Sequence, residues 1–366
     1  MRITILSRHF PPAVSGIGDH TDMLAAELTR RGMTVTVVTA PGAEERASYH
    51  VDATAGRWDG AGFAVIAEAV RRSEPDAVVW QYNPFSIGRK GLAPRAGHLA
   101  RALAGIAPLT VVFHELWFPW GRNGLRGILW ATVQRWQIRG VLRAASRWIV
   151  TTESRERALA RRDASRVVRI PVGTNIEPRA YSGDARGSRG IPADAFVVAH
   201  FGSVGPGRDL RPAFHAFRDL VGAGIDARLL LIGSTGPFEA PRDLSDRIHA
   251  TGPATREEIS GALQAADVYL HADPAGPSAG RRTTIVAALA HALPVVSYAG
   301  PDHALELRDG INCIVSEPTS EALARALREL AEDPERARQI GTQGRKTYEH
   351  HFSWERIGNE VLRVLK

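Results

Sequence analysis

Residues 279–296 read Ala-Gly-Arg-Arg-Thr-Thr-Ile-Val-Ala-Ala-Leu-Ala-His-Ala-Leu-Pro-Val-Val. The segment opens on small residues, places Arg281 and Arg282 before two threonines where a helix is expected to begin, and continues into an apolar strand near Pro294. Adjacent cations at a helix N-terminus favour binding of a phosphate or diphosphate, because the helix dipole and the N–H groups of the first turn add to their charge. The segment is therefore a candidate anion site in an α/β setting.

The composition describes an ordinary globular protein of two domains. The chain has 366 residues, 44% of them apolar and 23% charged, and a formal charge of +7 that suits an anionic partner without selecting one. One cysteine, Cys313, excludes a disulfide framework and fits a reducing compartment. The apolar N-terminal residues are too few for a signal peptide or membrane anchor, so we expect a cytoplasmic protein.

Short β-rich runs alternate with helical patterns in the first half. The helix expected over 21–31, between the first two strands, has inward-facing Leu24, Ala25 and Leu28, and Gly32 ends it. Near-continuous apolar strands indicate a parallel sheet covered by helices on both faces, and βαβ connections make it doubly wound. The predicted strands are 3–6, 34–38, 77–80, 109–113, 148–151 and 167–170.

Residues 179–194 are rich in Gly, Ser and charge and lack apolar periodicity, which predicts a linker. The alternation then restarts with strands expected at 197–201, 228–232, 268–271, 293–297 and 313–315. A final amphipathic helix is expected over 352–365. We predict an N-terminal domain over 1–178, joined by the C-terminal helix 352–366, and a C-terminal domain over 195–351. Such folds bind ligands at the carboxyl edges of their sheets.

Two features of the first half are candidate ligand-binding or catalytic sites. Gly16 and Gly18 follow the first strand and allow close approach of a ligand to a helix N-terminus, although a plain βα turn explains them equally well. His114 and Glu115 follow the fourth strand, where a histidine accepts or donates a proton or binds a sugar hydroxyl. A structural histidine is the alternative.

Residues 116–152 contain no acidic residue but six arginines interleaved with tryptophans. This composition is typical of a helix on an anionic membrane surface, and equally of a domain helix with core tryptophans and solvated arginines. The candidate membrane or acceptor contacts are Arg122, Arg126, Trp130, Arg135 and Arg139.

The second half offers a second Gly-rich turn, in which a backbone nest with Ser203 and Arg208 would hold a phosphate. A glycine turn with a solvated arginine is the alternative, but a second anion site at Arg281 and Arg282 suits a diphosphate. No spacing in the sequence reads as a metal site, and no nucleophile elbow, Walker A or kinase signature is present.

Motifs in the same order and spacing occur in retaining glycosyltransferases of the GT-B fold, the superfamily that includes family 4, and the chain resembles these enzymes over nearly its whole length. His114 and Glu115 stand where the family has a His-Asp pair. The other matching motifs are the loop 11–18, the turn 171–175, and the segments 230–233, 251–253, 265–267, 294–296, 309–312 and 352–354. The resemblance implies two Rossmann-like domains facing a cleft, with the C-terminal helix crossing back to the N-terminal domain.

The chain departs from the family at the donor site. Two glutamates that hold the donor sugar and the ribose in the family fall on Ala279 and Ala287 here, and one of two loop cations is absent. The resemblance implies a branch that grips its donor through the phosphates. The implied diphosphate-binding residues are Gly16, Gly18, Gly202, Ser203, Arg208, Ser278, Arg281, Arg282, Thr283 and Thr284.

The resemblance implies a hexosyltransferase-like, metal-independent enzyme without a cofactor, which moves a sugar from a nucleotide-sugar donor with anomeric retention. His114 would orient the donor sugar, with Glu115 supporting it or serving as an alternative base. The expected acceptor is a glycan or lipid-linked precursor in polysaccharide or glycolipid synthesis, met at the inner face of the plasma membrane, and no nucleic acid partner is expected. The alternatives are a non-catalytic GT-B protein that binds a glycan or a partner enzyme, and an epimerase of the same fold.

Overall fold

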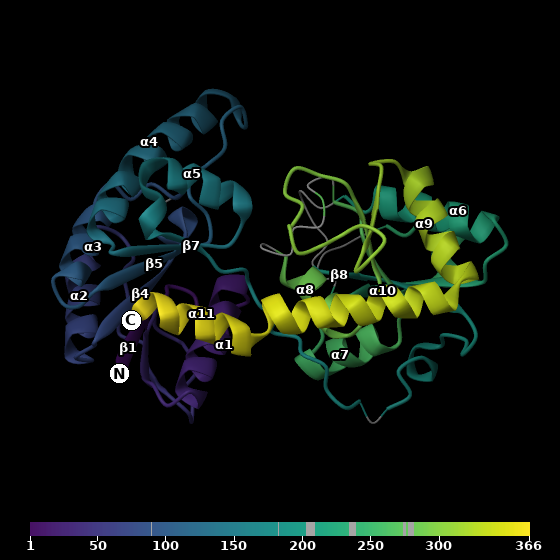
Figure 1. Cartoon of the computed structure of the whole chain (residues 1–366), viewed down its shortest axis with the longest axis horizontal. Coiled ribbons are helices and arrows are strands. Elements are labelled where there is room, and N and C mark those ends of the chain that lie inside the picture. The colour runs from purple at the N-terminus through teal and green to yellow at the C-terminus, as the bar shows by residue number, and fades with distance from the viewer. Residues whose placement is uncertain (89, 182, 203–208, 234–238, 274–275, 277–281) are drawn as a thin grey trace. The chain divides into compact units, whose positions relative to one another are not determined.

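The computed structural model describes residues 1–366 except 89, 182, 203–208, 234–238, 274–275 and 277–281. The chain divides into two compact units (Figure 1). Unit 1 contains Met1–Pro171 and Trp354–Lys366, and unit 2 contains Val172–Ser353.

In the described part of the chain, unit 1 is built on a parallel sheet of seven strands in the order β3-β2-β1-β4-β5-β6-β7. The strands are β1 Arg2–Leu6, β2 Thr34–Val38, β3 His50–Asp52, β4 Ala77–Tyr82, β5 Leu109–Phe113, β6 Arg147–Val150 and β7 Val167–Arg169. The helices are α1 Gly16–Arg30, α2 Phe63–Arg72, α3 Ala96–Ala104, α4 Gly124–Ala144, α5 Glu153–Asp163 and α11 Trp354–Leu365, with 3-10 turns η1 Pro84–Ser86 and η2 Ala164–Arg166.

Both faces of this sheet are buried, which explains the near-continuous apolar strands. On one face, Val78 and Trp80 pack with apolar side chains of α2, α3 and α4. On the other, Val79 and Val112 pack with side chains of α1 and α11, including Trp354. Figure 1 shows α2, α3 and α4 along one side of the sheet and α1 with α11 on the other. The C-terminal helix therefore belongs to the first unit, as predicted.

Unit 2 repeats the design with a six-stranded parallel sheet, within the described residues, in the order β10-β9-β8-β11-β12-β13. The strands are β8 Phe196–Phe201, β9 Ala227–Ile232, β10 Ile248–Ala250, β11 Val268–His271, β12 Val295–Tyr298 and β13 Ile314–Ser316. The helices are α6 Arg211–Gly222, α7 Arg256–Gln264, α8 Thr283–Ala290, α9 Ser320–Glu332 and α10 Pro334–Thr347, with η3 Gly187–Arg189, η4 Arg242–Arg247 and η5 Tyr348–Phe352.

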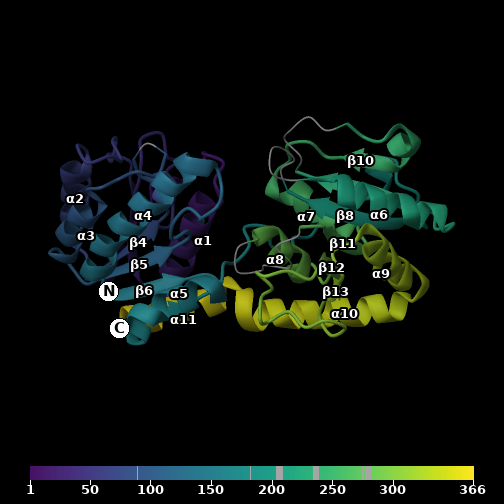
Figure 2. The same ribbon diagram turned by 90° about the horizontal axis from the view of Figure 1, so that it is seen from above.

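Helices α7 and α8 cover one face of this second sheet, and α6 with α9 covers the other. Figure 2 shows β8, β11, β12 and β13 between these two layers. Two parallel α/β units confirm the predicted fold class. Among the helices in the described ranges, none is long and apolar enough to cross a membrane.

The structure differs from the sequence prediction in three local features. Strands β3 and β10 were not predicted, because each has three residues at a sheet edge, too few to show a pattern. Helix α1 begins at Gly16 rather than at Thr21, since the Ser15 side chain caps it by accepting a hydrogen bond from the Gly18 N–H.

The segment 179–194, expected to be a linker, lies within unit 2, and the division between the units falls after Pro171. The Arg186 guanidinium holds the segment in place, because it donates to both carboxylate oxygens of Asp267 and to the carbonyl oxygens of Ala193, Ala195 and Ala265. Polar composition alone does not distinguish a loop held by such contacts from a free linker.

Candidate functional site

His114 lies at the carboxyl edge of the first sheet. Its backbone N–H donates to the carbonyl oxygen of Tyr82 at the end of β4, which holds the residue beside that strand. Its ring nitrogen Nε2 lies 2.6 Å from Oε1 of the buried Gln81. Because an amide oxygen only accepts, Nε2 carries the proton, and Nδ1 is left as an acceptor. The half-buried ring thus suits an incoming hydroxyl group.

His20, from the first turns of α1, packs edge-on against His114 with ring centroids 5.0 Å apart. On another side His20 meets Trp354 of α11, at 5.2 Å. Burial lowers the pKa of His20 to about 4. Burial, followed by the nearby charges of His20 and Arg155, lowers the pKa of His114 well below its usual value. Both imidazoles are therefore neutral at pH 7.

Glu115 forms an ion pair of 2.8 Å with Arg155, whose side chain is only 9% exposed. The same guanidinium donates to the Thr151 hydroxyl oxygen at 2.7 Å. Arg155 thus holds the Glu115 carboxylate at the first turn of α5, and a role for Glu115 as support or as base stays a prediction.

The two glycines at the start of α1 have different surroundings. Gly16 is exposed, and a Cβ added there would meet no atom within 4 Å. Gly18 is buried, and a Cβ there would lie 3.2 Å from the backbone of His9 and Phe10. Gly18 is therefore explained by helix packing, whereas Gly16 leaves the N-terminus of α1 open to a ligand.

The carboxyl edge of the second sheet carries the other predicted residues. Gly202 follows β8 with a φ of +141°, which favours glycine, and its N–H donates to the carbonyl oxygen of Ile232 at the end of β9. Thr283 and Thr284 are half-buried at the first turn of α8. Four predicted anion ligands lie outside the described residues: Ser203, Arg208, Ser278 and Arg281.

Arg282 immediately precedes α8 and is ion-paired with Asp273, which follows β11. Both side chains are about a quarter exposed, so the pair remains open to exchange with solvent anions. Ala287 is fully buried in the core against α7 and β12, so this position offers no polar group to a ligand. Ala279 lies outside the described part of the chain.

The five predicted contacts around α4 divide into two groups. Arg122, Arg126 and Arg139 are exposed. Trp130 instead packs on Phe118 with ring centroids 5.4 Å apart.

Arg135 also packs against aromatic side chains. Its guanidinium carbon lies 4.9 Å from the ring centre of Trp117 and 4.4 Å from that of Trp120, and Nη1 donates to the Phe118 carbonyl oxygen. A guanidinium stacks readily on aromatic faces, and a contact of the half-buried Arg135 with a membrane or acceptor stays a prediction.

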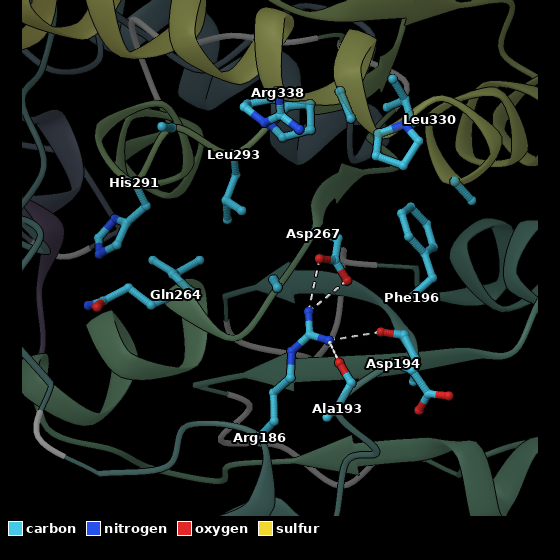
Figure 3. A pocket seen from close by; sticks show the side chains of 18 residues that line it. Arg186, Ala193, Asp194, Phe196, Gln264, Asp267, His291, Leu293, Leu330 and Arg338 are labelled. Atoms are coloured by element: carbon cyan, nitrogen blue, oxygen red, sulfur yellow. Dashed lines mark hydrogen bonds and ion pairs between the residues drawn. The ribbon is translucent and has the colours of Figure 1, made fainter.

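A pocket of about 610 Å³ in unit 2 lies at the opposite, amino edge of the second sheet (Figure 3). Its polar side chains are committed to the fold: Arg186 is bound to Asp267, His291 bonds the Ser260 hydroxyl, and Gln264 donates to the Arg179 carbonyl oxygen. Ligands of parallel α/β folds bind at the carboxyl edge. We assign this pocket no role.

Gln81, His20, Arg155 and Asp273 are site residues that the sequence analysis missed. Gln81 directly follows the predicted strand 77–80 and is the last residue but one of β4, so its position at a strand end was the available signal. Asp273 stands two positions after the predicted strand 268–271, which is a similar signal, whereas His20 and Arg155 come from helices. In the described part of the chain, no group of three or more His, Cys, Asp or Glu side chains is placed to hold a metal ion.

Two parallel α/β units, with polar side chains at their carboxyl edges and a C-terminal helix that returns to the first unit, define a GT-B-fold protein. The sequence model of Glycosyltransferase Family 4 matches residues 14–178, and that of Glycosyl transferases group 1 matches residues 195–333. The chain is a family 4-like glycosyltransferase, as its sequence predicts.

Curated relatives align along the whole chain. An alpha-maltose-1-phosphate synthase of Mycolicibacterium smegmatis is 26% identical over 405 residues, covering 100% of this chain and 99% of the relative. A D-inositol 3-phosphate glycosyltransferase of Kineococcus radiotolerans is 26% identical over 437 residues, covering 100% of this chain and 95% of the relative. Among solved structures, Anabaena HepE in complex with UDP-glucose superposes with a TM-score of 0.72 at 17% identity, covering 100% of this chain and 99% of HepE.

Proposed function

We propose that this glycosyltransferase moves a sugar from a nucleotide-sugar donor to a hydroxyl acceptor, with retention of anomeric configuration and without a metal ion. The observation that carries the proposal is the neutral His114, whose free acceptor nitrogen lies at the carboxyl edge of the first sheet. A neutral imidazole binds and orients a sugar hydroxyl without placing a positive charge beside a transition state that is itself cationic. The UDP-glucose complex of HepE supports the donor class.

The second unit supplies the anion-binding groups in this proposal. A departing nucleoside diphosphate accumulates negative charge, which fixed cations and helix N–H groups stabilise. Arg282, Thr283 and Thr284 stand at the first turn of α8, where the helix dipole favours an anion. Arg282 would exchange the Asp273 carboxylate for the diphosphate, a stronger anion in the same position. Ser203, Arg208, Ser278 and Arg281 belong to the proposed site as sequence predictions.

The proposed acceptor is a glycan or lipid-linked precursor of a cell-surface polysaccharide or glycolipid. The exposed arginines of α4 support an acceptor that lies at an anionic surface. The names of the two curated relatives favour a second candidate, a small phosphorylated acceptor. Assays with both acceptor classes, read by release of the nucleoside diphosphate, distinguish the two.

The test begins with thermal unfolding in the presence of UDP-, GDP- and dTDP-sugars. A donor at about 100 times its Kd should stabilise the protein by about 2.7 kcal/mol. Arg282→Ala should abolish the shift. Arg336→Ala is the matched control, because Arg336 is also an arginine paired with one carboxylate, Glu329, on another element of unit 2.

Turnover assays complete the test. His114→Ala should lower kcat while the donor-induced thermal shift of unit 2 persists. Activity should survive EDTA, and the product anomer should match the donor by NMR. Absence of any thermal shift and of any turnover in the folded protein would contradict the proposal and favour a non-catalytic GT-B protein. The alanines at positions 279 and 287, where the family has glutamates, would fit that alternative.

A further inference from the structure

Helix α4 carries exposed apolar side chains between Leu125 and Trp136. Leu125 is 85% exposed, and Leu129 and Trp136 are each 57% exposed. At 100° per residue these side chains and Ile128, which is 48% exposed, form one stripe along the helix. Arg139 and Arg143 continue the same stripe, both exposed. The helix has 21 residues and is therefore about 31 Å long.

The inward side of the same helix carries two glutamines beside the core residues Ile138, Val141 and Leu142. Gln134 and Gln137 are 0% and 2% exposed. The Gln134 side chain accepts a hydrogen bond from the Phe118 N–H, and Gln137 bonds the backbone of Gly91 and Ala93. A helix whose outer side faces water carries polar residues there, not leucine, isoleucine and tryptophan. The exposed apolar stripe of α4 thus favours contact with an apolar partner rather than with water.

The charge around this stripe has one sign. Residues 77–152, which include α3 and α4, contain ten basic residues and one acidic residue, Glu115. That acid is ion-paired with Arg155. The rest of the chain contains 36 basic and 38 acidic residues, so the positive charge of the whole protein resides in this stretch. Helix α3 packs directly on α4 (Figures 1 and 2), where a Cβ on Gly97 would lie 2.8 Å from Gly140, and α3 carries the exposed Arg101.

We propose that this surface docks unit 1 on an anionic lipid bilayer. We define the α4 surface as the apolar side chains Leu125, Ile128, Leu129 and Trp136 with the cations Arg122, Arg126, Arg139 and Arg143. The apolar side chains enter the boundary between headgroups and acyl chains, and the arginines bind lipid phosphates. Tryptophan suits this boundary, because its ring is apolar at one end and polar at the other.

The pattern favours a bilayer over other partners. A second copy of the chain would bring two strongly basic regions together, and their repulsion opposes self-association. A nucleic acid would bind the arginines through its phosphates, but its phosphate backbone would not cover exposed leucines at helical spacing. An anionic bilayer satisfies both the charge and the apolar stripe. The proposal deepens the lipid-acceptor part of the proposed function, since it gives unit 1 a fixed place on the membrane that would carry the acceptor.

The test is flotation with vesicles of phosphatidylcholine alone and with added phosphatidylglycerol, using the full chain without donor or acceptor. We expect binding only to the anionic vesicles, weakened by salt. Replacing Leu125, Leu129 and Trp136 together by serine should lower the partition coefficient about tenfold or more. Val65→Ser on α2 is the matched control, because Val65 is an exposed apolar residue of unit 1, 52% exposed, outside the surface.

A charge-reversed variant tests the electrostatic half. Arg122→Glu with Arg126→Glu should abolish binding, whereas Arg161→Glu on the exposed side of α5 should leave binding almost unchanged. No binding of the wild-type protein to anionic vesicles would overturn the proposal. So would a dimer in sedimentation that the serine variant dissociates, because a second copy would then cover the stripe. Since no donor is present, failure here is separate from failure of transferase activity.

Discussion

The buried His20 makes the stability of unit 1 depend on pH. Its ring is enclosed between His114 and Trp354, and burial lowers its pKa from 6.5 to about 4. In the unfolded chain the same imidazole titrates near 6.5. Between these two values the unfolded state binds a proton that the folded state does not, so acid favours unfolding.

The magnitude follows from that shift. A difference of about 2.5 pKa values corresponds to about 3 kcal/mol of stability, which is fully present above pH 6.5 and is lost as the pH falls through about 4. At about pH 5 the loss is about 2 kcal/mol. His114 adds to the effect in the same direction, because its pKa is also lowered.

Tryptophan fluorescence is the natural assay, because all eight tryptophans belong to unit 1: Trp58, Trp80, Trp117, Trp120, Trp130, Trp136, Trp148 and Trp354. Urea unfolding followed in this way measures unit 1 even if the two units unfold separately. We expect the wild type to lose about 2 kcal/mol more than His20→Phe between about pH 7.5 and pH 5. Phenylalanine keeps an aromatic ring between the neighbours and removes the titrating group.

Parallel curves of unfolding free energy against pH for the wild type and His20→Phe would refute this reasoning. They would mean that His20 keeps an ordinary pKa in the folded protein. The other histidines titrate in both proteins and largely cancel from the comparison. Any relaxation of the His114 pKa in the variant flattens its curve further and so widens the expected difference.

Further substitutions test unit 1. Glu115→Ala should cost about 2–3 kcal/mol of stability, because it removes the carboxylate from a buried guanidinium. Arg155→Met should cost only about 1 kcal/mol, because it leaves a carboxylate that water reaches. Equal losses in urea unfolding would contradict the burial of Arg155. Gly97→Val should lower the melting temperature by several degrees, because its side chain meets Gly140 across the α3–α4 contact. Ala102→Val, on the exposed side of α3, is the control, and the two variants should not melt alike.

Much of the fold was predictable because both sheets are buried on both faces. Such strands must be apolar along their whole length, so β4 and β5 stand out in the sequence without alternation. The three-residue strands β3 and β10 lack that signal. Polar composition marked 179–194 as a linker, whereas Arg186 binds this segment to Asp267 through a contact distant in sequence.

The candidate site was predictable only where chemistry coincides with a strand end. His114 follows β5 directly, so its place at the carboxyl edge is a consequence of the strand. Gln81, which sets the tautomer of His114, comes from β4, and His20 comes from a helix more than ninety residues earlier. Helical spacing suggested an outward contact for Arg135, but it did not reveal that the guanidinium stacks on two tryptophans.

The sequence by itself determined the α/β class, the two-unit division of strands and helices, the family resemblance and the concentration of arginine around α4. These follow from local patterns, because burial and helix periodicity constrain residues close together in the chain. The tertiary structure alone decided which imidazoles are neutral, which carboxylate holds which arginine and which side of α4 faces outward. Those properties depend on burial and on partners distant in sequence, and a local pattern carries neither.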